Sequence, residues 1–244
     1  MRKTILGHCI YETSQGTKVL QNPLYRWLTL GSPAIQTLIN RRHPERAEMK
    51  YLHHLSLSVR ANPADCLLLG LGGAGIAHAL KPFLSQLTLH AVEESSEIID
   101  IAQSYFMSNT LPHLSIIHED ALTYVLQCKR QYQHVMVDLF DAHTLPKQCM
   151  THEFFEHCTK ILKPQGIIAV NLANRHEQMP VLLQLREHFK QSIVSMPVKG
   201  SANMVIIASK DPSVNGLLDL LRRDNLKTLY WDPLWGCIAE ILHI

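Results

Sequence analysis

Residues 67–75 read LLLGLGGAG, and this stretch decides the fold that the sequence predicts. The leucines belong to a short, continuously apolar run, Cys66–Leu69, as expected of a strand buried on both faces of a parallel sheet. The glycines allow a tight turn and a close approach to a ligand, and a helix begins directly after them. Gly70, Gly72 and Gly75 have the spacing of the dinucleotide-binding fingerprint, a weak signal on its own. The turn either binds a nucleoside or only connects strand and helix.

Strand-like and helix-like segments alternate along the chain after Pro63. The next strands are expected at residues 88–92, 114–118, 134–137 and 167–172, and a closing pair at 193–196 and 204–208. Helices are expected at residues 74–86, 96–107, 120–129, 151–162, 179–190 and 212–223. This rhythm is typical of an α/β fold with a doubly wound, mainly parallel sheet of the Rossmann-like type.

The first part of the chain has a different pattern. Short segments at residues 7–13, 18–21 and 25–30 lie between turn residues, which indicates a small antiparallel hairpin or meander. Residues 44–60 have apolar side chains at helical spacing. We therefore expect a small β appendage with a helix in residues 1–61 and the large sheet in residues 62–244.

Composition excludes several classes of protein. The chain has 244 residues, 46% hydrophobic and 18% charged, which argues against disorder, a collagen-like repeat and a coiled coil. The net charge of +2 does not indicate a nucleic-acid or membrane surface. No apolar run approaches the ~18 residues of a membrane span, and no signal peptide is recognisable. We expect a cytoplasmic protein without nucleic-acid or membrane partners.

Acidic residues follow each of the next three predicted strands. Glu93 comes 18 residues after the last glycine of the turn, close to the ~20 expected of a carboxylate that binds ribose hydroxyls. Asp120 could bind an adenine amino group or cap a helix, and either role could be shared with Glu119. Asp138 and Asp141 could bind a cation or accept a proton from an amine. For Glu93, and for Asp138 with Asp141, the alternative is a solvated loop carboxylate.

The glycine turn and the three groups of acids that follow it, in this order, resemble the spermidine synthase (polyamine aminopropyltransferase) family. The catalytic domain of this family has a methyltransferase-type Rossmann fold. The chain is most similar to divergent bacterial members, and the likeness extends to about Ala208. It includes YRWLTLG at residues 25–31, MKY at 49–51, DLFD at 138–141, MTHEFF at 150–155 and LKPQG at 162–166.

The resemblance implies transfer of an aminopropyl group from decarboxylated S-adenosylmethionine, a co-substrate rather than a permanent cofactor, to an amine or polyamine. The nucleoside would be bound by Gly70, Gly72, Gly73, Glu93, Glu119, Asp120 and Ala121. Asp138 would be the general base, and Asp141 would position cationic groups. Gln36 and Tyr51 would face the acceptor. The resemblance also implies a homodimer, formed through the N-terminal strands.

Two positions differ from the family pattern. The family's glycine turn, GGGDGG, has an aspartate that binds the amine of the aminopropyl arm, where this chain has Gly73. The stretch YLHH at residues 51–54 lacks the acid that the family has there. Since intact S-adenosylmethionine carries an extra carboxylate, the first difference also fits a methyltransferase. A non-catalytic nucleoside-binding homologue is the third reading.

We expect no metal site. The stretch HEFFEH at residues 152–157 is similar to the H-E-x-x-H motif of zinc proteases, but its histidines are five residues apart. On a helix they would point about 140° away from each other and could not share one metal ion.

Overall fold

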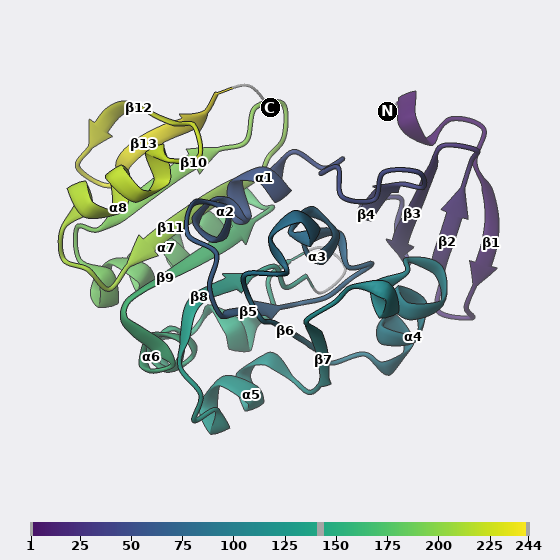
Figure 1. The fold of residues 1–244 in the computed structure, drawn as a ribbon, viewed down its shortest axis with the longest axis horizontal. Helices are drawn as coiled ribbons and strands as arrows, with labels where there is room; N and C mark the ends of the chain where they lie inside the picture. The colour runs from purple at the N-terminus through teal and green to yellow at the C-terminus, as the bar shows by residue number, and fades with distance from the viewer. Residues whose placement is uncertain (1, 141–143, 243–244) are drawn as a thin grey trace.

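The computed structural model describes residues 2–140 and 144–242, which form two β-sheets with helices packed around them (Figure 1). The smaller sheet is at one end of the molecule, and the β12–β13 hairpin is at the other (Figure 1). Within these residues no helix is long and apolar enough to cross a membrane, and no cluster of three or more His, Cys, Asp or Glu side chains could hold a metal ion.

The large sheet has, in the described part of the chain, nine strands in the order β12-β13-β10-β11-β9-β8-β5-β6-β7. Their bounds are β5 (Cys66–Leu69), β6 (Leu89–Glu93), β7 (Leu114–His118), β8 (Tyr132–Val137), β9 (Leu162–Leu172), β10 (Ile193–Pro197), β11 (Met204–Ser209), β12 (Leu226–Asp232) and β13 (Gly236–Ile241). Strands β7, β6, β5, β8 and β9 are parallel, and β11 is antiparallel to β9. The predicted Rossmann-like sheet is confirmed.

Helices cover both faces of this sheet. Successive side chains of a buried strand point to opposite faces, so both faces of the sheet are apolar and pack against helices. One face packs against α1 (Tyr51–Leu55), α2 (Leu57–Ala61), α3 (Gly75–Ala79) and α8 (Val214–Arg222). The other face packs against α5 (Ala121–Gln127), α6 (His152–Lys160) and α7 (Arg175–Phe189). Short 3-10 turns occupy Arg2–Thr4, Lys81–Phe83, Ser108–Thr110 and Lys147–Met150.

The predicted N-terminal meander is an antiparallel sheet of β1 (His8–Glu12), β2 (Thr17–Gln21), β3 (Tyr25–Leu30) and β4 (Ile35–Asn40). It packs its apolar face, which includes Val19, Leu28 and Ile39, against α4 (Ser96–Tyr105) and Phe106. The small sheet is therefore attached to the large one through the helix that follows β6, and this contact places β4 beside the glycine turn.

The structure corrects three sequence-based expectations. Of the helix expected at residues 44–60, only the part from Tyr51 on is helical. It is divided into α1 and α2, because the Ser56 hydroxyl donates to the Leu52 carbonyl at 2.6 Å and the backbone leaves helical geometry there. The helix expected at 74–86 ends at Ala79, and a 3-10 turn that contains Pro82 replaces the rest. Strands β4, β12 and β13 were not predicted.

Helices α1 and α2 lie before the expected domain boundary at residue 62, yet their apolar side chains belong to the core of the large sheet. Leu52, Leu55 and Leu57 are at most 3% exposed and pack in the same cluster as Leu68 of β5 and Met136 of β8. The division into residues 1–61 and 62–244 stays a prediction.

Candidate active site

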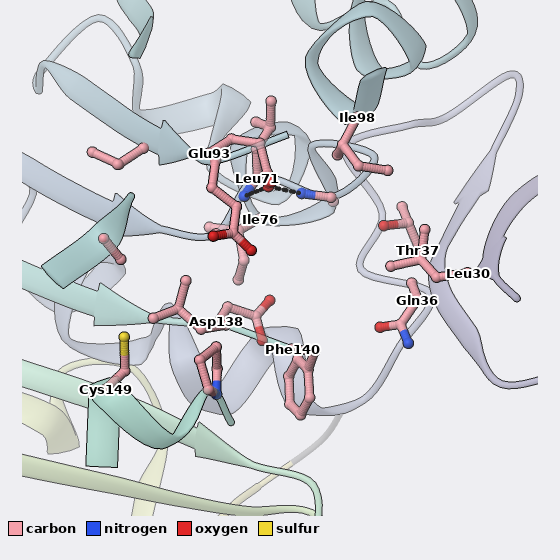
Figure 2. Close-up of a pocket in the computed structure, with 18 of the residues that line it drawn as sticks. Leu30, Gln36, Thr37, Leu71, Ile76, Glu93, Ile98, Asp138, Phe140 and Cys149 are labelled. Atoms are coloured by element: carbon pink, nitrogen blue, oxygen red, sulfur yellow. Dashed lines mark hydrogen bonds between the residues drawn. The ribbon is translucent and has the colours of Figure 1, made fainter. Parts of the chain in front are cut away.

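A cavity lies at the carboxyl ends of β5, β6 and β8, where the order of the parallel strands reverses on either side of β5. Such switch points are where open α/β sheets bind ligands. The cavity and its open mouth together enclose about 890 Å³ of space. Its lining includes nine predicted site residues: Gln36, Tyr51, Gly70, Gly72, Glu93, Glu119, Asp120, Ala121 and Asp138. Figure 2 shows Glu93 and Asp138 on facing sides of this space.

The glycine turn and Glu93 are joined by hydrogen bonds. Oε2 of Glu93, at the end of β6, accepts the backbone N–H groups of Leu71 at 3.0 Å and Gly72 at 3.4 Å (Figure 2). Its Oε1 accepts the N–H of Ser95 at 3.1 Å. Backbone donors thus fix this carboxylate at the edge of the cavity, as a ribose-binding acid would require.

Gly70, just after β5, lies against the backbone of Asp138, just after β8. Its φ of +94° is one that other residues rarely adopt, and a Cβ there would lie 2.3 Å from the backbone oxygen of Asp138. Glycine at this position therefore lets the end of β8 bring Asp138 beside the turn.

Gly73 is a predicted nucleoside-binding residue that does not line the cavity. It packs instead against the N-terminal sheet: its N–H donates to Oγ1 of Thr37 at 2.9 Å. A Cβ on Gly73 would lie 2.9 Å from Cγ2 of Thr37 and 3.1 Å from Cδ1 of Phe106. Thr37, which sequence reasoning missed, occupies the space beside the position where the resembling family has its aspartate.

Asp120 has one of the two roles that the sequence left open, the helix cap, and its contact with an adenine stays a prediction. Its side chain caps α5 by accepting the N–H of Thr123 at 2.8 Å, and the residue also lines the cavity. Its neighbour Glu119 accepts the backbone N–H of Asp120 at 3.0 Å. Both acids therefore lie in the same cavity as Glu93.

Asp138 follows β8 and is held by two side chains. The Tyr51 hydroxyl donates to Oδ2 at 3.1 Å, and Nδ2 of Asn171 donates to Oδ1 at 2.9 Å. Burial raises the pKa of Asp138 to about 6, against the opposing effect of these two hydrogen bonds. Burial, together with the nearby Asp138 carboxylate, raises the pKa of Tyr51 well above its usual value, so its hydroxyl remains a donor. Asp138 is thus a carboxylate that can exchange a proton near neutral pH.

Asn171 and Asn203 are polar residues of this site that sequence reasoning missed. Asn171 is fully buried, in the predicted apolar strand IIAVNL, and its Oδ1 accepts Nδ2 of Asn203 at 2.9 Å. A buried amide in such a strand needs polar partners, and this was the signal available in the sequence. Asp141 was also predicted to act here and lies outside the described residues.

The lining of the cavity is acidic. It includes Glu93, Glu94, Glu119, Asp120 and Asp138, and none of the described lining residues is Lys, Arg or His. Burial, with the nearby Asp120 and Glu94 charges, raises the pKa of the Cys149 thiol to about 12, so this lining residue is neutral. Such a cavity suits a cationic ligand, because carboxylates replace the hydration that the cation loses.

Comparison with known families decides the identity of the domain. Residues 45–209, more than half of the chain, match the model of the spermine/spermidine synthase domain. The chain belongs to this family. The matched segment of the spermine/spermidine synthase domain begins just before α1 and ends with β11, so it includes the glycine turn, Glu93 and Asp138. The N-terminal sheet and the β12–β13 hairpin lie outside it.

Individual relatives of this family member are distant. The polyamine aminopropyltransferase of Chromobacterium violaceum is 25% identical over 190 residues, 75% of this chain and 72% of that protein. The eEF1A lysine and N-terminal methyltransferase homolog of Drosophila pseudoobscura is 24% identical over 233 residues, 83% of this chain but only 34% of that protein. A probable spermidine synthase from Corynebacterium glutamicum has the same fold, with a TM-score of 0.73 at 17% identity over 90% of this chain and 87% of that one.

Proposed function

We propose that this protein transfers an aminopropyl group from decarboxylated S-adenosylmethionine to an amine, with Asp138 as the general base. The observation that carries the proposal is the placement of Asp138, with Tyr51 and Asn171 bound to it, in the same acidic cavity as the glycine turn. Polyamine aminopropyltransferases among the relatives support this reaction.

The nucleoside would extend from Glu93 to Asp120. Glu93 would accept hydrogen bonds from the ribose, and Asp120, with Glu119 and Ala121, would contact the adenine. Gly70 and Gly72 would let the backbone approach the nucleoside closely. The sulfonium would then lie toward Asp138, on the facing side of the cavity (Figure 2).

The chemical step needs only the groups present in this cavity. The amine nitrogen attacks the carbon next to the sulfonium sulfur, the carbon–sulfur bond breaks, and a neutral thioether nucleoside leaves. The nitrogen loses one proton, which Asp138 accepts. A base with a pKa of about 6 is ionised at neutral pH yet still takes up a proton from the positively charged nitrogen that attack creates.

The acidic lining favours the decarboxylated nucleoside over the intact one. Decarboxylated S-adenosylmethionine carries two positive charges and no carboxylate, whereas the intact form adds a carboxylate, and no basic side chain among the described lining residues would pair with it. Methyl transfer is the second candidate, favoured by Gly73 in place of the family's aspartate and by the Drosophila relative.

Thermal unfolding with each nucleoside separates the two candidates. At about 100 times its dissociation constant a ligand adds about 2.7 kcal/mol of stability, a shift of roughly 5–10 °C for a chain of this size. A larger shift with the decarboxylated form supports aminopropyl transfer, and a larger shift with intact S-adenosylmethionine supports methyl transfer. No shift with either would contradict both proposals.

Asp138→Asn tests the base. We expect turnover, followed as the thioether nucleoside by mass spectrometry with diamines and polyamines as acceptors, to fall about 10²–10⁴-fold. Affinity for the nucleoside should change little. Asp100→Asn, which removes an exposed charge on α4, is the matched control and should retain turnover. Equal turnover of the two variants would remove Asp138 from the mechanism.

The homodimer stays a proposal as well. We propose that two copies associate through the N-terminal sheet, as the family resemblance implies, and light scattering of the full chain measures the mass directly. A monomer at micromolar concentration would contradict it.

A further inference from the structure

A chain of hydrogen bonds crosses three neighbouring strand ends and terminates on Asp138. The Ser201 hydroxyl donates to Oδ1 of Asn203, Nδ2 of Asn203 donates to Oδ1 of Asn171 at 2.9 Å, and Nδ2 of Asn171 donates to Oδ1 of Asp138 at 2.9 Å. The strand register produces this alignment: Val137 pairs with Val170, and Asn171 pairs with Val205, so Asp138, Asn171 and the residue before β11 meet at one edge.

The outer end of this chain is a pair of hydrogen bonds between Ser201 and Asn203. The backbone N–H of Asn203 donates to Oγ of Ser201 at 3.2 Å, and the Ser201 hydroxyl donates to Oδ1 of Asn203. Each amide has one acceptor side and one donor side. Once Asn203 presents its amino group to Asn171, Asn171 must present its own amino group to Asp138.

The surrounding loop holds this end in place. Gln178 of α7 donates to the carbonyl of Ala202 at 2.9 Å, Lys50 donates to the carbonyl of Lys199 at 3.2 Å, and the N–H of Val198 donates to the carbonyl of Asn203 at 2.9 Å. These bonds, two of them from helical regions, therefore hold the residues between β10 and β11, and with them the backbone of Asn203.

We propose that Asn171 and Asn203 are positioning residues that keep Oδ1 of Asp138 an acceptor only, so that the proton of the attacking amine is received on Oδ2. The bond that breaks is N–H of the amine, and the bond that forms is O–H on Oδ2. Oδ2 accepts one hydrogen bond from Tyr51, and its second lone pair is the site for the proton. This inference rests on the proposed role of Asp138 as base.

The groups around Asp138 affect whether its carboxyl group is protonated. Among the residues that the structure describes, Tyr51 of α1 is a titratable group that binds Asp138, and the other acids that line the cavity are Glu93, Glu94, Glu119 and Asp120. Burial raises the pKa of Asp138, and the hydrogen bond from Asn171 lowers it. An amide held in the donating orientation therefore keeps the base ionised at neutral pH.

Asn203→Asp reverses the chain with almost no change in size. A carboxylate at position 203 only accepts, so it draws the amino group of Asn171 toward itself and turns the carbonyl oxygen of Asn171 toward Asp138. Two facing oxygens then favour a protonated Asp138. We expect its midpoint, followed by carboxyl-carbon NMR in the ligand-free protein, to rise by about one pH unit.

Two variants separate orientation from charge and from folding. Ala202→Asp adds the same charge to the same loop, at an exposed position outside the amide chain, and should move the midpoint by less than a third as much. Asn203→Ala removes the orienting amide without adding charge, and we expect about half the shift of Asn203→Asp. Asn203→Ala therefore tests the inference on its own if Asn203→Asp does not fold.

Turnover provides the second readout. In both Asn203 variants the pH–rate profile should shift upward by the same amount as the NMR midpoint, with kcat lowered at pH 7 and KM nearly unchanged. An unmoved midpoint in both variants, or an equal shift in Ala202→Asp, would overturn the inference. Because the titration needs no turnover, an inactive wild-type protein would contradict the proposed function but leave this measurement decisive for the amide chain.

Discussion

The two facing sides of the cavity hold their carboxylates in different ways. Glu93 is bound by three backbone N–H groups from the glycine turn and from Ser95, whereas Asp138 is bound by two side chains, Tyr51 and Asn171. Backbone N–H groups remain when neighbouring side chains are substituted. The hydrogen bonds of Glu93 therefore depend on the backbone conformation of the glycine turn and not on the side chains around it. The donors of Asp138 can each be removed by one substitution, so the proton affinity of that side can be adjusted separately.

The largest expected effect on ligand affinity comes from a substitution on the Glu93 side. Glu93→Ala removes the proposed ribose acceptor and leaves the N–H groups of Leu71 and Gly72 without their partner. We expect about 100-fold weaker nucleoside binding by calorimetry, since hydrogen bonds to a charged group contribute about 1.5–3 kcal/mol. Glu97→Ala, in the first turn of α4, is the control for general effects on this region. Unchanged affinity of Glu93→Ala would show that the turn binds the nucleoside without this acid.

A second prediction sharpens the comparison through pH. Because the pKa of Asp138 is raised on folding from 3.8 to about 6, the folded state holds this proton more tightly than the unfolded state. The resulting stabilisation is complete below about pH 4 and is lost as the pH rises through 6. Relative to Asp138→Asn, the free energy of unfolding should fall by up to about 2 kcal/mol between pH 4 and pH 7 in urea titrations. Parallel pH curves for the two proteins would contradict the raised pKa.

A third prediction concerns the turn on the Glu93 side. Gly73→Ala places a methyl group 2.9 Å from Cγ2 of Thr37 and should cost about 1 kcal/mol, a few degrees in Tm. Thr37→Ser removes that methyl and keeps the hydroxyl that binds the Gly73 N–H. The double variant should therefore recover part of the loss. Additive effects of the two substitutions would mean that the contact with Thr37 does not set the cost.

The smallest expected effect is a change in the pKa of Asp138. Tyr51→Phe removes one of the two donors to Asp138, so the carboxylate loses part of its stabilisation and its pKa should rise by about half a unit. Carboxyl-carbon NMR of the ligand-free protein measures this, with Tyr11→Phe in the N-terminal sheet as the control. A midpoint that does not move would mean that side-chain donors do not adjust this base.

Sequence patterns could predict what lies at the ends of parallel strands. Glu93 and Asp138 each follow a buried apolar strand, and parallel strands end at the same edge, so their meeting in one cavity followed from the strand order. The family resemblance added Tyr51 and Gln36, which come from the segment before the first Rossmann strand and also line the cavity.

Residues that depend on long-range register could not be predicted in this way. Thr37 reaches Gly73 only because β4 folds beside the glycine turn, and Asn203 reaches Asn171 only because β11 is inserted antiparallel next to β9. No local pattern contains either fact. The β12–β13 hairpin was missed because Leu229, Tyr230 and Trp231 are consecutive and exposed, which hides the alternation by which half-buried strands are recognised.

The contact between Thr37 and Gly73 has a thermodynamic consequence. Thr37 and Gln36 line the cavity from β4, so the ligand site is shared between the two sheets (Figure 2). A nucleoside that fills it stabilises only molecules in which the small sheet is docked. Ligand binding should therefore slow amide hydrogen exchange across β2, β3 and β4, far beyond the atoms it touches, whereas exchange in the distant β12–β13 hairpin should remain unchanged. The stability of the contact between the N-terminal sheet and the rest of the protein can in this way be measured residue by residue, from the amide exchange rates with and without ligand.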